Sequence, residues 1–266
     1  MFQNGKCEDP RLNAFKKEWF EARNCLDIGC SSGILTINIA KKFSCQSMLG
    51  IDIDPDRVKD ANLNLSKTVE SISAENKKRE VFDQKHILGS DTHTDQVEEA
   101  NLNLGKVVEL ESTEKKRKRD QTENLEQGID DEEIPTRNLS DIVSFKQENF
   151  LESEYNPLEQ HYDTILCLSV TLWIHLNWGD DGLKTLFQKI WNMLLPNGLF
   201  VLEPHKWKTY EHNRNISETA TMNYLNIKIR PDKFLEILLG EIGFSELIHL
   251  SSVRNRDIMV FQKTAM

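Results

Sequence analysis

Two neighbouring segments of the sequence combine acidic residues with glycines in a pattern typical of a nucleotide site. Asp27 lies near the end of a short apolar run, and Gly29 and Gly33 frame a turn that leads into a helical pattern. Glycine suits such a turn because a Cβ atom would keep the backbone away from a ligand, while a helix start offers unpaired N–H groups. Asp52 ends the next apolar run, at close to the spacing of roughly 20 residues expected for a carboxylate that binds ribose hydroxyls.

The charge of Asp27 narrows the class of nucleotide. Asp27 stands where a dinucleotide site keeps a glycine, and its carboxylate would repel a pyrophosphate. The same carboxylate suits a nucleoside that carries a cationic amino acid. We therefore predict S-adenosyl-L-methionine as the cofactor, with Asp27 near its methionine end and Asp52 on its ribose.

Length and composition limit the classes of protein. A chain of 266 residues has room for one α/β domain with an insertion, and a net charge of -10 argues against non-specific nucleic-acid binding by the whole surface. The N-terminal residues lack an apolar signal core, and the longest apolar run, residues 164–176, is too short to span a bilayer. We expect a soluble, intracellular protein with no membrane partner. Since none of the cysteines (Cys7, Cys25, Cys30, Cys45 and Cys167) forms a C-x-x-C pair, we expect reduced thiols and no metal.

Hydrophobic periodicity predicts alternating strands and helices, and hence a parallel sheet. The expected helices cover residues 11–20, 34–42, 55–65, 181–195 and 231–239, and the expected strands cover residues 24–28, 47–53, 142–145, 164–168, 199–202, 246–251 and 258–262.

A repeat interrupts this pattern. Residues 48–52 resemble residues 87–91, and residues 61–65 recur identically at 100–104, in both cases 39 positions later. We assign the first copy to the sheet, because Ile51 and Ile53 keep an apolar alternation that Ser90 and Thr92 lose. Two copies are too few for a solenoid. The expected organisation is an N-terminal tail (1–10), a discontinuous domain (11–65 and 139–266) and a charged, partly repeated, disordered insertion (66–138) that tolerates deletion.

A basic run at residues 115–119 lies in this insertion. It has the composition of a nuclear-import signal or an RNA-contacting arm, but a solvated linker beside the acidic residues 130–133 is the favoured interpretation.

Four further motifs carry a family resemblance: Glu-Asn-Phe at 148–150, residues 166–171, Trp-Ile-His-Leu-Asn-Trp-Gly-Asp at 173–180, and Glu-Pro-His-Lys-Trp at 203–207. Together they resemble the Bin3 family, the methyltransferases that include the methylphosphate capping enzyme of small nuclear RNA, and they are most similar to its plant members. The resemblance covers residues 8–65 and from 141 to the C-terminus. The block that ends in His-Leu-Asn-Trp-Gly-Asp, together with Glu-Pro-x-x-Trp at 203–207, is the most specific part, because core patterning does not produce two tryptophans, a histidine and a proline at fixed spacing.

This resemblance implies a class I S-adenosylmethionine-dependent methyltransferase, with a Rossmann-like, seven-stranded, mostly parallel sheet and helices on both faces. It implies an O-methyltransferase that acts on the 5′ phosphate of a small nuclear or other small non-coding RNA, and it favours the nucleus over the cytoplasm. The resemblance does not imply that the protein forms an oligomer. The positions that match the family's cofactor residues are Arg11, Gly29, Cys30, Ser31, Asp52, Ile53, Asn149, Phe150 and Leu168. Asn149 and Phe150 would hold the adenine, although Phe150 fits a core aromatic equally well.

The implied reaction transfers a methyl group to a phosphate oxygen that is already anionic, so it needs positioning and desolvation rather than a general base. The candidates that would clamp the phosphate are His175, Asn177, Lys206 and Arg214. The alternative for His175 is a structural histidine whose ring caps a loop, which is the more frequent role of a lone histidine. Trp173, Trp178 and Trp207 are candidates for stacking on RNA bases, but large aromatics near strand ends are more often part of a core.

Two departures from the family pattern bear on activity. Relatives carry a Tyr- and Arg-rich segment upstream of the region that matches residues 8–12, whereas this chain has Met-Phe-Gln-Asn-Gly-Lys at residues 1–6. The second departure is Leu172, which stands where lysine is common. The alternative is therefore a catalytically weak or inactive RNA-binding paralogue that keeps the fold. A methyltransferase for a small molecule or a protein is a third reading that rests on the versatility of the fold alone.

Overall fold

The computed structural model describes residues 8–88, 137–155 and 162–265 of the chain. Residue contacts divide the chain into two units, Met1–Ala74 with Arg137–Met266, and Glu75–Thr136. All the residues of the candidate site belong to the first unit. Of the second unit, only the end of helix α2 is described. No helix in the described ranges is long and apolar enough to cross a membrane.

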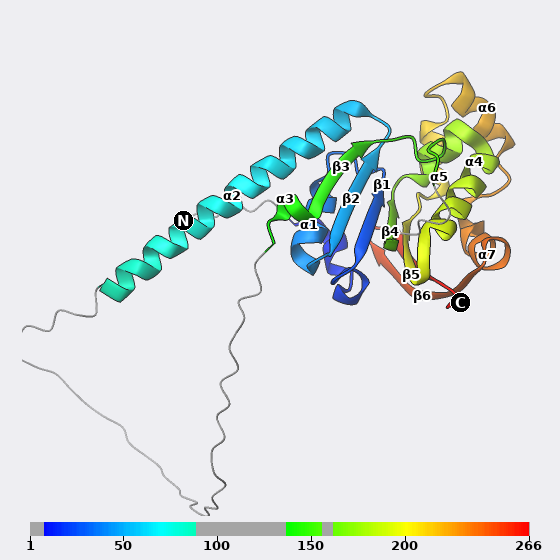
Figure 1. Cartoon of the computed structure of the whole chain (residues 1–266). Coiled ribbons are helices and arrows are strands. Elements are labelled where there is room, and N and C mark those ends of the chain that lie inside the picture. The colour runs from blue at the N-terminus through cyan, green and yellow to red at the C-terminus, as the bar shows by residue number, and fades with distance from the viewer. Residues whose placement is uncertain (1–7, 89–136, 156–161, 266) are drawn as a thin grey trace, which may run out of the picture. The chain divides into compact units, whose positions relative to one another are not determined.

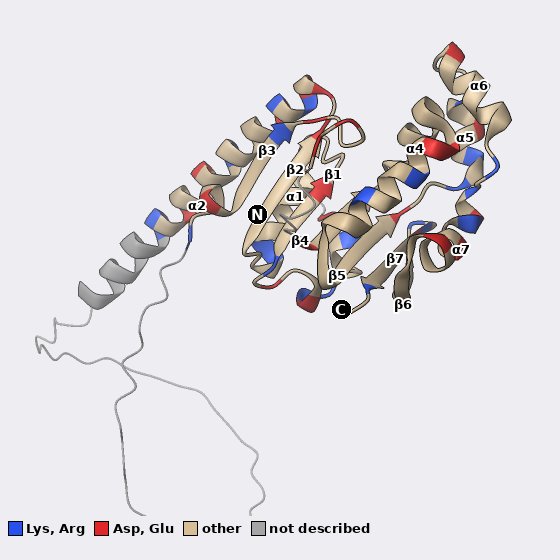
Figure 2. Cartoon of the chain, turned by 45° about the vertical axis from the view of Figure 1, so that its right-hand side comes forward, with Lys and Arg blue, Asp and Glu red and all other residues tan. Residues whose placement is uncertain are grey.

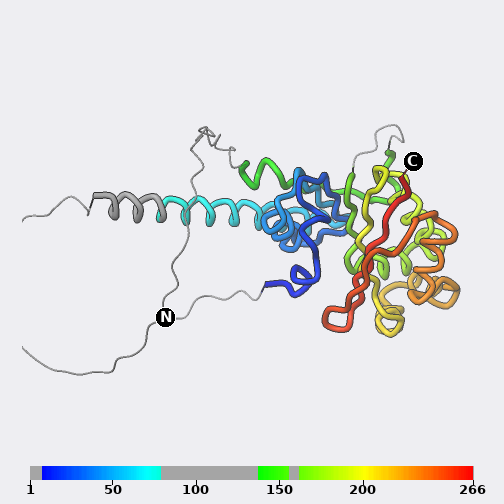
Figure 3. The backbone as a smooth tube through the Cα atoms, turned by 90° about the horizontal axis from the view of Figure 1, so that it is seen from below, coloured from blue at the N-terminus to red at the C-terminus, as the bar shows by residue number. Residues whose placement is uncertain are grey.

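Seven strands form one sheet in the order β3-β2-β1-β4-β5-β7-β6 (Figure 1). The strands are β1 (Asn24–Ile28), β2 (Ser47–Asp52), β3 (Val143–Gln147), β4 (Tyr162–Leu168), β5 (Leu194–Glu203), β6 (Phe244–Val253) and β7 (Arg256–Lys263). The first five pair in parallel, whereas β7 is antiparallel to both β5 and β6. The parallel strands therefore all end at the same edge of the sheet. Figure 3 shows the β6–β7 hairpin in orange to red.

Helices cover both faces of this sheet. The α-helices are α1 (Ile34–Phe43), α2 (Pro55–Leu88), α3 (Leu139–Ile142), α4 (Thr171–Met193), α5 (Trp207–Asn213), α6 (Glu218–Asn226) and α7 (Phe234–Ile237). Short 3-10 turns η1 (Pro10–Asn13), η2 (Lys17–Trp19) and η3 (Pro231–Lys233) and a π turn η4 (Leu238–Ile242) complete the described helical elements.

Neighbouring residues of one strand separate the two cores. Ile165 of β4 packs in the cluster that contains Phe187 of α4, whereas Leu166 packs in the cluster that contains Ile37 of α1. Side chains alternate between the faces of a strand, so a strand buried on both faces reads as a continuous apolar run. The predicted fold class, with a seven-stranded, mostly parallel sheet between helices, is confirmed.

Three expected helices differ from those observed. The predicted helix at 11–20 is wrong, because this segment forms the short turns η1 and η2. Helix α4 begins at Thr171 rather than near Asp181, since the motif at 173–180 is itself helical and a kink at Gly179, with φ of +65°, joins it to the rest. Helix α2 continues past Leu65 to Leu88.

The first copy of the repeat forms β2 and the start of α2, as predicted. Residues 66–88 of the predicted insertion therefore belong to a helix. The remainder of the second copy from Gly89 onward and the basic run at 115–119 lie outside the described residues. The disorder of the insertion and its tolerance of deletion stay predictions.

Candidate functional site

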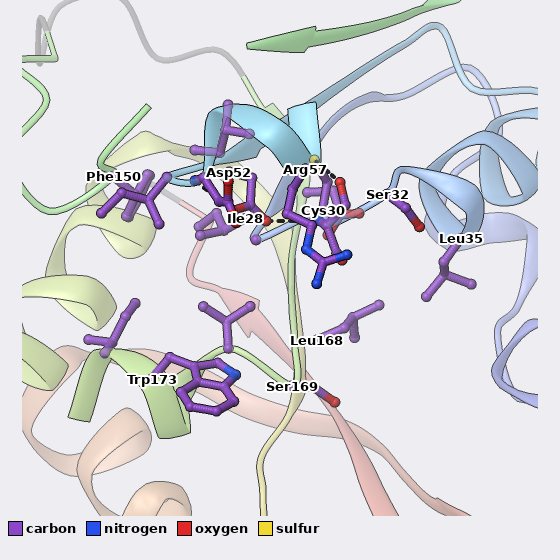
Figure 4. Close-up of a pocket in the computed structure, with 18 of the residues that line it drawn as sticks. Ile28, Cys30, Ser32, Leu35, Asp52, Arg57, Phe150, Leu168, Ser169 and Trp173 are labelled. Carbon is purple, nitrogen blue, oxygen red and sulfur yellow. Dashed lines mark hydrogen bonds between the residues drawn. The ribbon is translucent and has the colours of Figure 1, made fainter. Parts of the chain in front are cut away.

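A cavity of about 960 Å³ lies where the parallel strands end. Acidic residues, red in Figure 2, mark the ends of β1, β2 and β5 there. The predicted cofactor residues that line the cavity are Arg11, Asp27, Gly29, Cys30, Ser31, Asp52, Ile53, Asn149, Phe150 and Leu168. Gly33 does not line it. Figure 4 shows Phe150, Asp52 and Arg57 along one side, and Trp173, Leu168 and Ser169 along the other.

The glycine turn brings the backbone close to the junction of β4 and α4. Gly29 has a φ of +73°, and a Cβ atom there would lie 2.3 Å from Val170 Cγ2. Gly33 also has a positive φ, of +70°, but its missing side chain makes room for Phe145 and Ala61. Gly29 thus makes room for Val170, which also lines the cavity, whereas Gly33 makes room for Phe145 of β3 and Ala61 of α2 at the start of α1.

Asp52 anchors the turn from the neighbouring strand. Its carboxylate accepts the backbone N–H of Ser31 at 2.9 Å and that of Asp54 at 3.0 Å. These two bonds hold the carboxylate at the wall of the cavity, where it also keeps lone pairs for a ligand. This is the arrangement expected of a residue that binds ribose hydroxyls.

Asp27 supplies a buried acid at the floor of the cavity. Its side chain is only 4% exposed, and the Thr36 hydroxyl donates to it at 2.6 Å. Burial raises the pKa of Asp27 to about 6, against the opposing effects of Thr36 and Arg11. A desolvated carboxylate favours a cationic partner, so the residues present fit the amino-acid end of S-adenosylmethionine.

A chain of ion pairs closes the cavity on the side of β5. The Arg11 guanidinium donates twice to Asp9, at 3.0 and 2.7 Å, and its Nη1 lies 3.5 Å from Glu203 Oε2. The other oxygen of Glu203 accepts from Arg256 Nη1 at 3.0 Å and from the Ser169 hydroxyl. Glu203 is fully buried, and its charge is therefore compensated from both sides.

Of the four predicted clamp residues, only Asn177 lines the cavity. Lys206 is exposed at the start of α5, and the Arg214 guanidinium lies 5.4 Å over the ring of Tyr224. Neither these two residues nor His175 contributes to the wall of the cavity.

His175 is fully buried, with both ring nitrogens near partners. Its Nε2 lies 2.8 Å from Asp180 Oδ1, and its Nδ1 lies 3.3 Å from the Tyr210 hydroxyl. Burial lowers the pKa of His175 although Asp180 opposes this, so the ring is neutral at pH 7. Asp180 also accepts the N–H groups of Lys228 and Ile229. This geometry favours the structural role for His175.

The tryptophans separate into two groups. Trp173 and Trp178 line the cavity and are 43% and 37% exposed. Trp207 instead stacks between Tyr210 and Tyr224, with ring centroids 5.2 and 4.9 Å away. Trp173 and Trp178 therefore keep ring surface free for a ligand, whereas Trp207 is part of the packing among α5, α6 and α4.

Leu172, one of the two departures from the family pattern, points away from the cavity. It is fully buried in a small cluster with Leu176, Tyr210 and Ala220. The leucine therefore stabilises the contact of α4 with α5 and α6.

Several residues of the cavity were not predicted. Ser169, His205 and Arg256 line it on the side of β4, β5 and β7, and Arg57 lines it on the side of β2. His205 lies inside the Glu-Pro-His-Lys-Trp motif at 203–207, but its spacing did not indicate a residue of the site. Arg256 had no sequence signal, because it enters the site only through the antiparallel pairing of β7 with β5.

Comparisons with known proteins agree with this geometry. The family Bicoid-interacting protein 3 (Bin3) matches residues 162–263, and the family Ribosomal protein L11 methyltransferase (PrmA) matches residues 11–129. A Methanosarcina mazei structure described as a SAM-dependent methyltransferase aligns with 97% of this chain and 99% of its own, with a TM-score of 0.52 and 14% identity. This likeness shows the fold.

Similar curated proteins cover nearly the whole chain. A probable RNA methyltransferase of Arabidopsis thaliana is 47% identical over 98% of this chain and 76% of its own length. The U6 snRNA methylphosphate capping enzyme Amus of Drosophila melanogaster is 31% identical over 98% of this chain and 70% of its own length. The 7SK snRNA methylphosphate capping enzyme of Mus musculus is also 31% identical, but this chain spans only 39% of it. The chain belongs to the Bin3 family.

Proposed function

We propose that this protein is an S-adenosyl-L-methionine-dependent O-methyltransferase that acts on the 5′ phosphate of an RNA. The observation that carries the proposal is a single cavity with two chemically different halves. The half next to β1, β2 and β3 suits a nucleoside with a cationic amino acid, through Asp27, Asp52 and Phe150. The half next to β4, β5 and β7 offers Trp173 and Arg256 to an acceptor.

The strand order places these halves side by side. Along the sheet, β3, β2 and β1 are followed by β4, β5 and β7. A nucleoside held by Asn149 and Asp52 would therefore direct its amino-acid end toward Asp27 and Leu168 at β1 and β4. An acceptor on the β5 side would meet it there. In open α/β sheets, ligands bind beyond the carboxyl ends of the strands, as this arrangement requires.

The chemistry needs little from the protein beyond placement. When bound, the cofactor supplies an electrophilic methyl group. Since the attacking phosphate oxygen is anionic at neutral pH, no residue has to remove a proton in that step. The tasks of this chain are to hold the two reactants in line and to exclude water, and good alignment alone contributes several kcal/mol, about 7 or more in favourable cases. Trp173 and Trp178 fit the role of apolar walls on which the first RNA bases stack.

The names of the relatives support the substrate class. They describe capping enzymes of small nuclear RNA, an RNA 5′-monophosphate methyltransferase of Rattus norvegicus and a pre-miRNA 5′-monophosphate methyltransferase of Xenopus laevis. We extend this to a small non-coding RNA as the substrate of this chain and to the nucleus as its place of action. Fluorescent tagging of the full chain would test the compartment, and exclusion from the nucleus would contradict it.

The test of the function is methyl transfer to matched RNA ends. The full chain is incubated with methyl-labelled S-adenosylmethionine and one RNA sequence that carries a 5′ monophosphate, a 5′ triphosphate or a 5′ hydroxyl. We expect label on at least one phosphorylated RNA and none on the hydroxyl form, and label on the hydroxyl RNA at equal rate would contradict the proposal.

RNA binding without transfer would instead support the alternative, an inactive RNA-binding paralogue. In that case Leu172→Lys tests whether the lysine that is common in the family restores transfer. Because Leu172 is buried away from the cavity, we expect Leu172→Lys to destabilise the protein rather than to restore transfer.

A further inference from the structure

The acceptor half of the cavity contains an arginine that no prediction assigned. We propose that Arg256, with His205 beside it, forms the subsite that binds the 5′ phosphate of the RNA. This inference rests on the proposed function, and it names the residues that would distinguish a phosphorylated RNA end from a hydroxyl end.

Arg256 owes its place to the antiparallel end of the sheet. It is the first residue of β7, on the hairpin that Figure 3 shows in orange to red. β7 pairs with β5, and β5 ends at Glu203, two residues before His205. Both side chains line the cavity together with Ser169. The hairpin therefore brings a cation to the end of the cavity that lies farthest along the strand order from Asp52.

The guanidinium of Arg256 is held on one side and free on the other. Its Nη1 donates to Glu203 Oε1 and to the Ser169 hydroxyl, both at 3.0 Å. Within the described ranges, Nε and Nη2 of Arg256 donate to no residue, and the side chain is 51% exposed. Since the guanidinium is planar and rigid, two bonds at one nitrogen orient the remaining N–H groups. That is the fork that binds two oxygens of a phosphate.

Glu203 holds this arginine in place, and neither of its carboxylate oxygens is left free to repel a bound phosphate. Its side chain is 1% exposed, Oε1 accepts from Arg256 and Ser169, and Oε2 faces Arg11. Both of its oxygens are thus directed at protein donors. We assign Glu203 as a positioning residue for Arg256.

The other arginines of the cavity are less suited to this task. Arg11 is engaged twice by Asp9, and these bonds, together with the charge of Glu203, raise the pKa of its guanidinium despite burial. Arg57 follows the acidic residues at the end of β2, on the nucleoside side. Among the described residues that line the acceptor half, Arg256 is therefore the cation with donors to spare.

His205 supplies a second polar atom at the same place. Its Nδ1 is buried and has no hydrogen-bond partner among the described residues. A buried polar atom without a partner is costly. Since Nδ1 is closed to solvent, a turn of the ring is needed before a ligand in the cavity can reach it. Burial and the nearby charge of Arg256 lower the pKa of His205, so at pH 7 the ring is neutral and has one N–H to donate. A phosphate oxygen would accept that hydrogen bond beside the two from Arg256.

Binding of matched RNA ends tests the subsite independently of turnover. The full chain is saturated with S-adenosylhomocysteine and titrated with one fluorescent oligoribonucleotide that carries either a 5′ monophosphate or a 5′ hydroxyl. We expect the wild type to prefer the phosphorylated RNA, and Arg256→Gln to reduce that preference about tenfold, the loss expected for a charge-assisted hydrogen bond. Arg256→Lys should keep part of it. The matched control is Arg254→Gln, on the same hairpin but outside the cavity, which should change nothing.

Two further readouts separate this role from general damage. The affinity for S-adenosylhomocysteine should be unchanged in Arg256→Gln, and in methyl transfer the variant should raise KM for RNA while kcat changes little. A phosphate preference that persists in Arg256→Gln would overturn the subsite and leave the proposed function standing. Loss of preference in Arg256→Gln, from a wild type that binds but never methylates, would support the subsite and contradict the enzymatic function. A wild type with no preference for the phosphorylated end would overturn both.

Discussion

The Lys189 ammonium of helix α4 lies 2.6 Å from the carbonyl oxygen of Phe150. It also donates to the carbonyl oxygens of Leu151 at 3.2 Å and Ser153 at 2.6 Å, and it lies 5.2 Å over the Phe150 ring. Burial lowers the pKa of Lys189. The three carbonyl oxygens replace water as the hydrogen-bond acceptors of its ammonium group. One side chain thus fixes the loop that carries Asn149 and Phe150.

We predict that Lys189→Met weakens S-adenosylhomocysteine binding about tenfold, because the loop loses a charged donor worth about 1.5–3 kcal/mol. Calorimetric titration measures the loss, and hydrogen exchange of the peptide that contains Ser153 should accelerate. Lys184→Met is the control, since Lys184 lies on the same helix but pairs with Glu241 at the surface. Equal affinities for the wild type and Lys189→Met would show that Lys189 does not position the loop for ligand binding.

The choice between the two repeat copies predicts an asymmetry between two aspartates. Asp52→Ala should weaken cofactor binding by about 1–3 kcal/mol, because it removes a carboxylate that binds the ribose and holds the turn at Ser31. Asp91→Ala, at the matching position of the second copy, should leave the affinity unchanged. Calorimetry on both variants measures this difference, and equal losses would show that the first copy was wrongly chosen.

The buried acid predicts a pH dependence of ligand binding. With a pKa of about 6, Asp27 is protonated below that pH in the free protein, whereas a cationic amino group favours the ionised form. The affinity for S-adenosylhomocysteine should therefore be about tenfold lower at pH 5 than at pH 7. Asp27→Asn should flatten the profile, and a wild-type affinity that is constant over this range would contradict the assignment.

The same raised pKa predicts the sign of a stability change. A carboxyl group whose pKa is raised by folding stabilises the protein fully below its unfolded value of 3.8, and this contribution is lost as the pH rises through about 6. In urea denaturation without ligand, Asp27→Asn should lack this loss and be more stable than the wild type at pH 7.

A side chain at Gly29 should clash with Val170, and shortening Val170 should relieve only part of the effect. Gly29→Ala places a methyl group against Val170 and puts a side chain at a positive φ, which costs about 1–2 kcal/mol. We expect a lower Tm and weaker ligand binding. Val170→Ala in the same chain should recover the part due to the clash, and a double variant no better than the single one would place the whole effect in the backbone.

His175 tests the difference between a structural residue and a phosphate clamp. His175→Gln should lower stability by about 1–3 kcal/mol, because Asp180 and Tyr210 lose their shared partner. The preference for a phosphorylated RNA end should not change below the new Tm. A loss of that preference with an unchanged Tm would return His175 to the role of a clamp.

The elements that the sequence predicts well are those with a local signal. Residues 24–28 form β1 with the predicted bounds, and α1 begins at Ile34 as expected, because apolar alternation and glycine punctuation act over a few residues. The start of α2 at Pro55 follows from the same kind of signal.

The errors lie where tertiary contacts decide. Residues 173–180 read as a chemical motif, yet they are helical. Their polar side chains make tertiary contacts, since Asp180 accepts the N–H groups of Lys228 and Ile229 after α6. Most of the cofactor half of the cavity could be predicted, since its residues follow strands in sequence. Of the acceptor half, Trp173, Trp178 and Asn177 were candidates from the sequence and line the cavity. Arg256 could not be predicted, because it reaches Glu203 only through the pairing of distant strands.

The most direct test of the central claim is where the methyl group goes. An RNA with a 5′ phosphate is incubated with the full chain and S-adenosylmethionine, digested to nucleotides and analysed by mass spectrometry. We expect one added methyl group on the phosphate of the 5′-terminal nucleotide and none on internal nucleotides. Methylation of a base or a ribose, or an unmodified 5′ nucleotide from RNA that the protein binds, would contradict it.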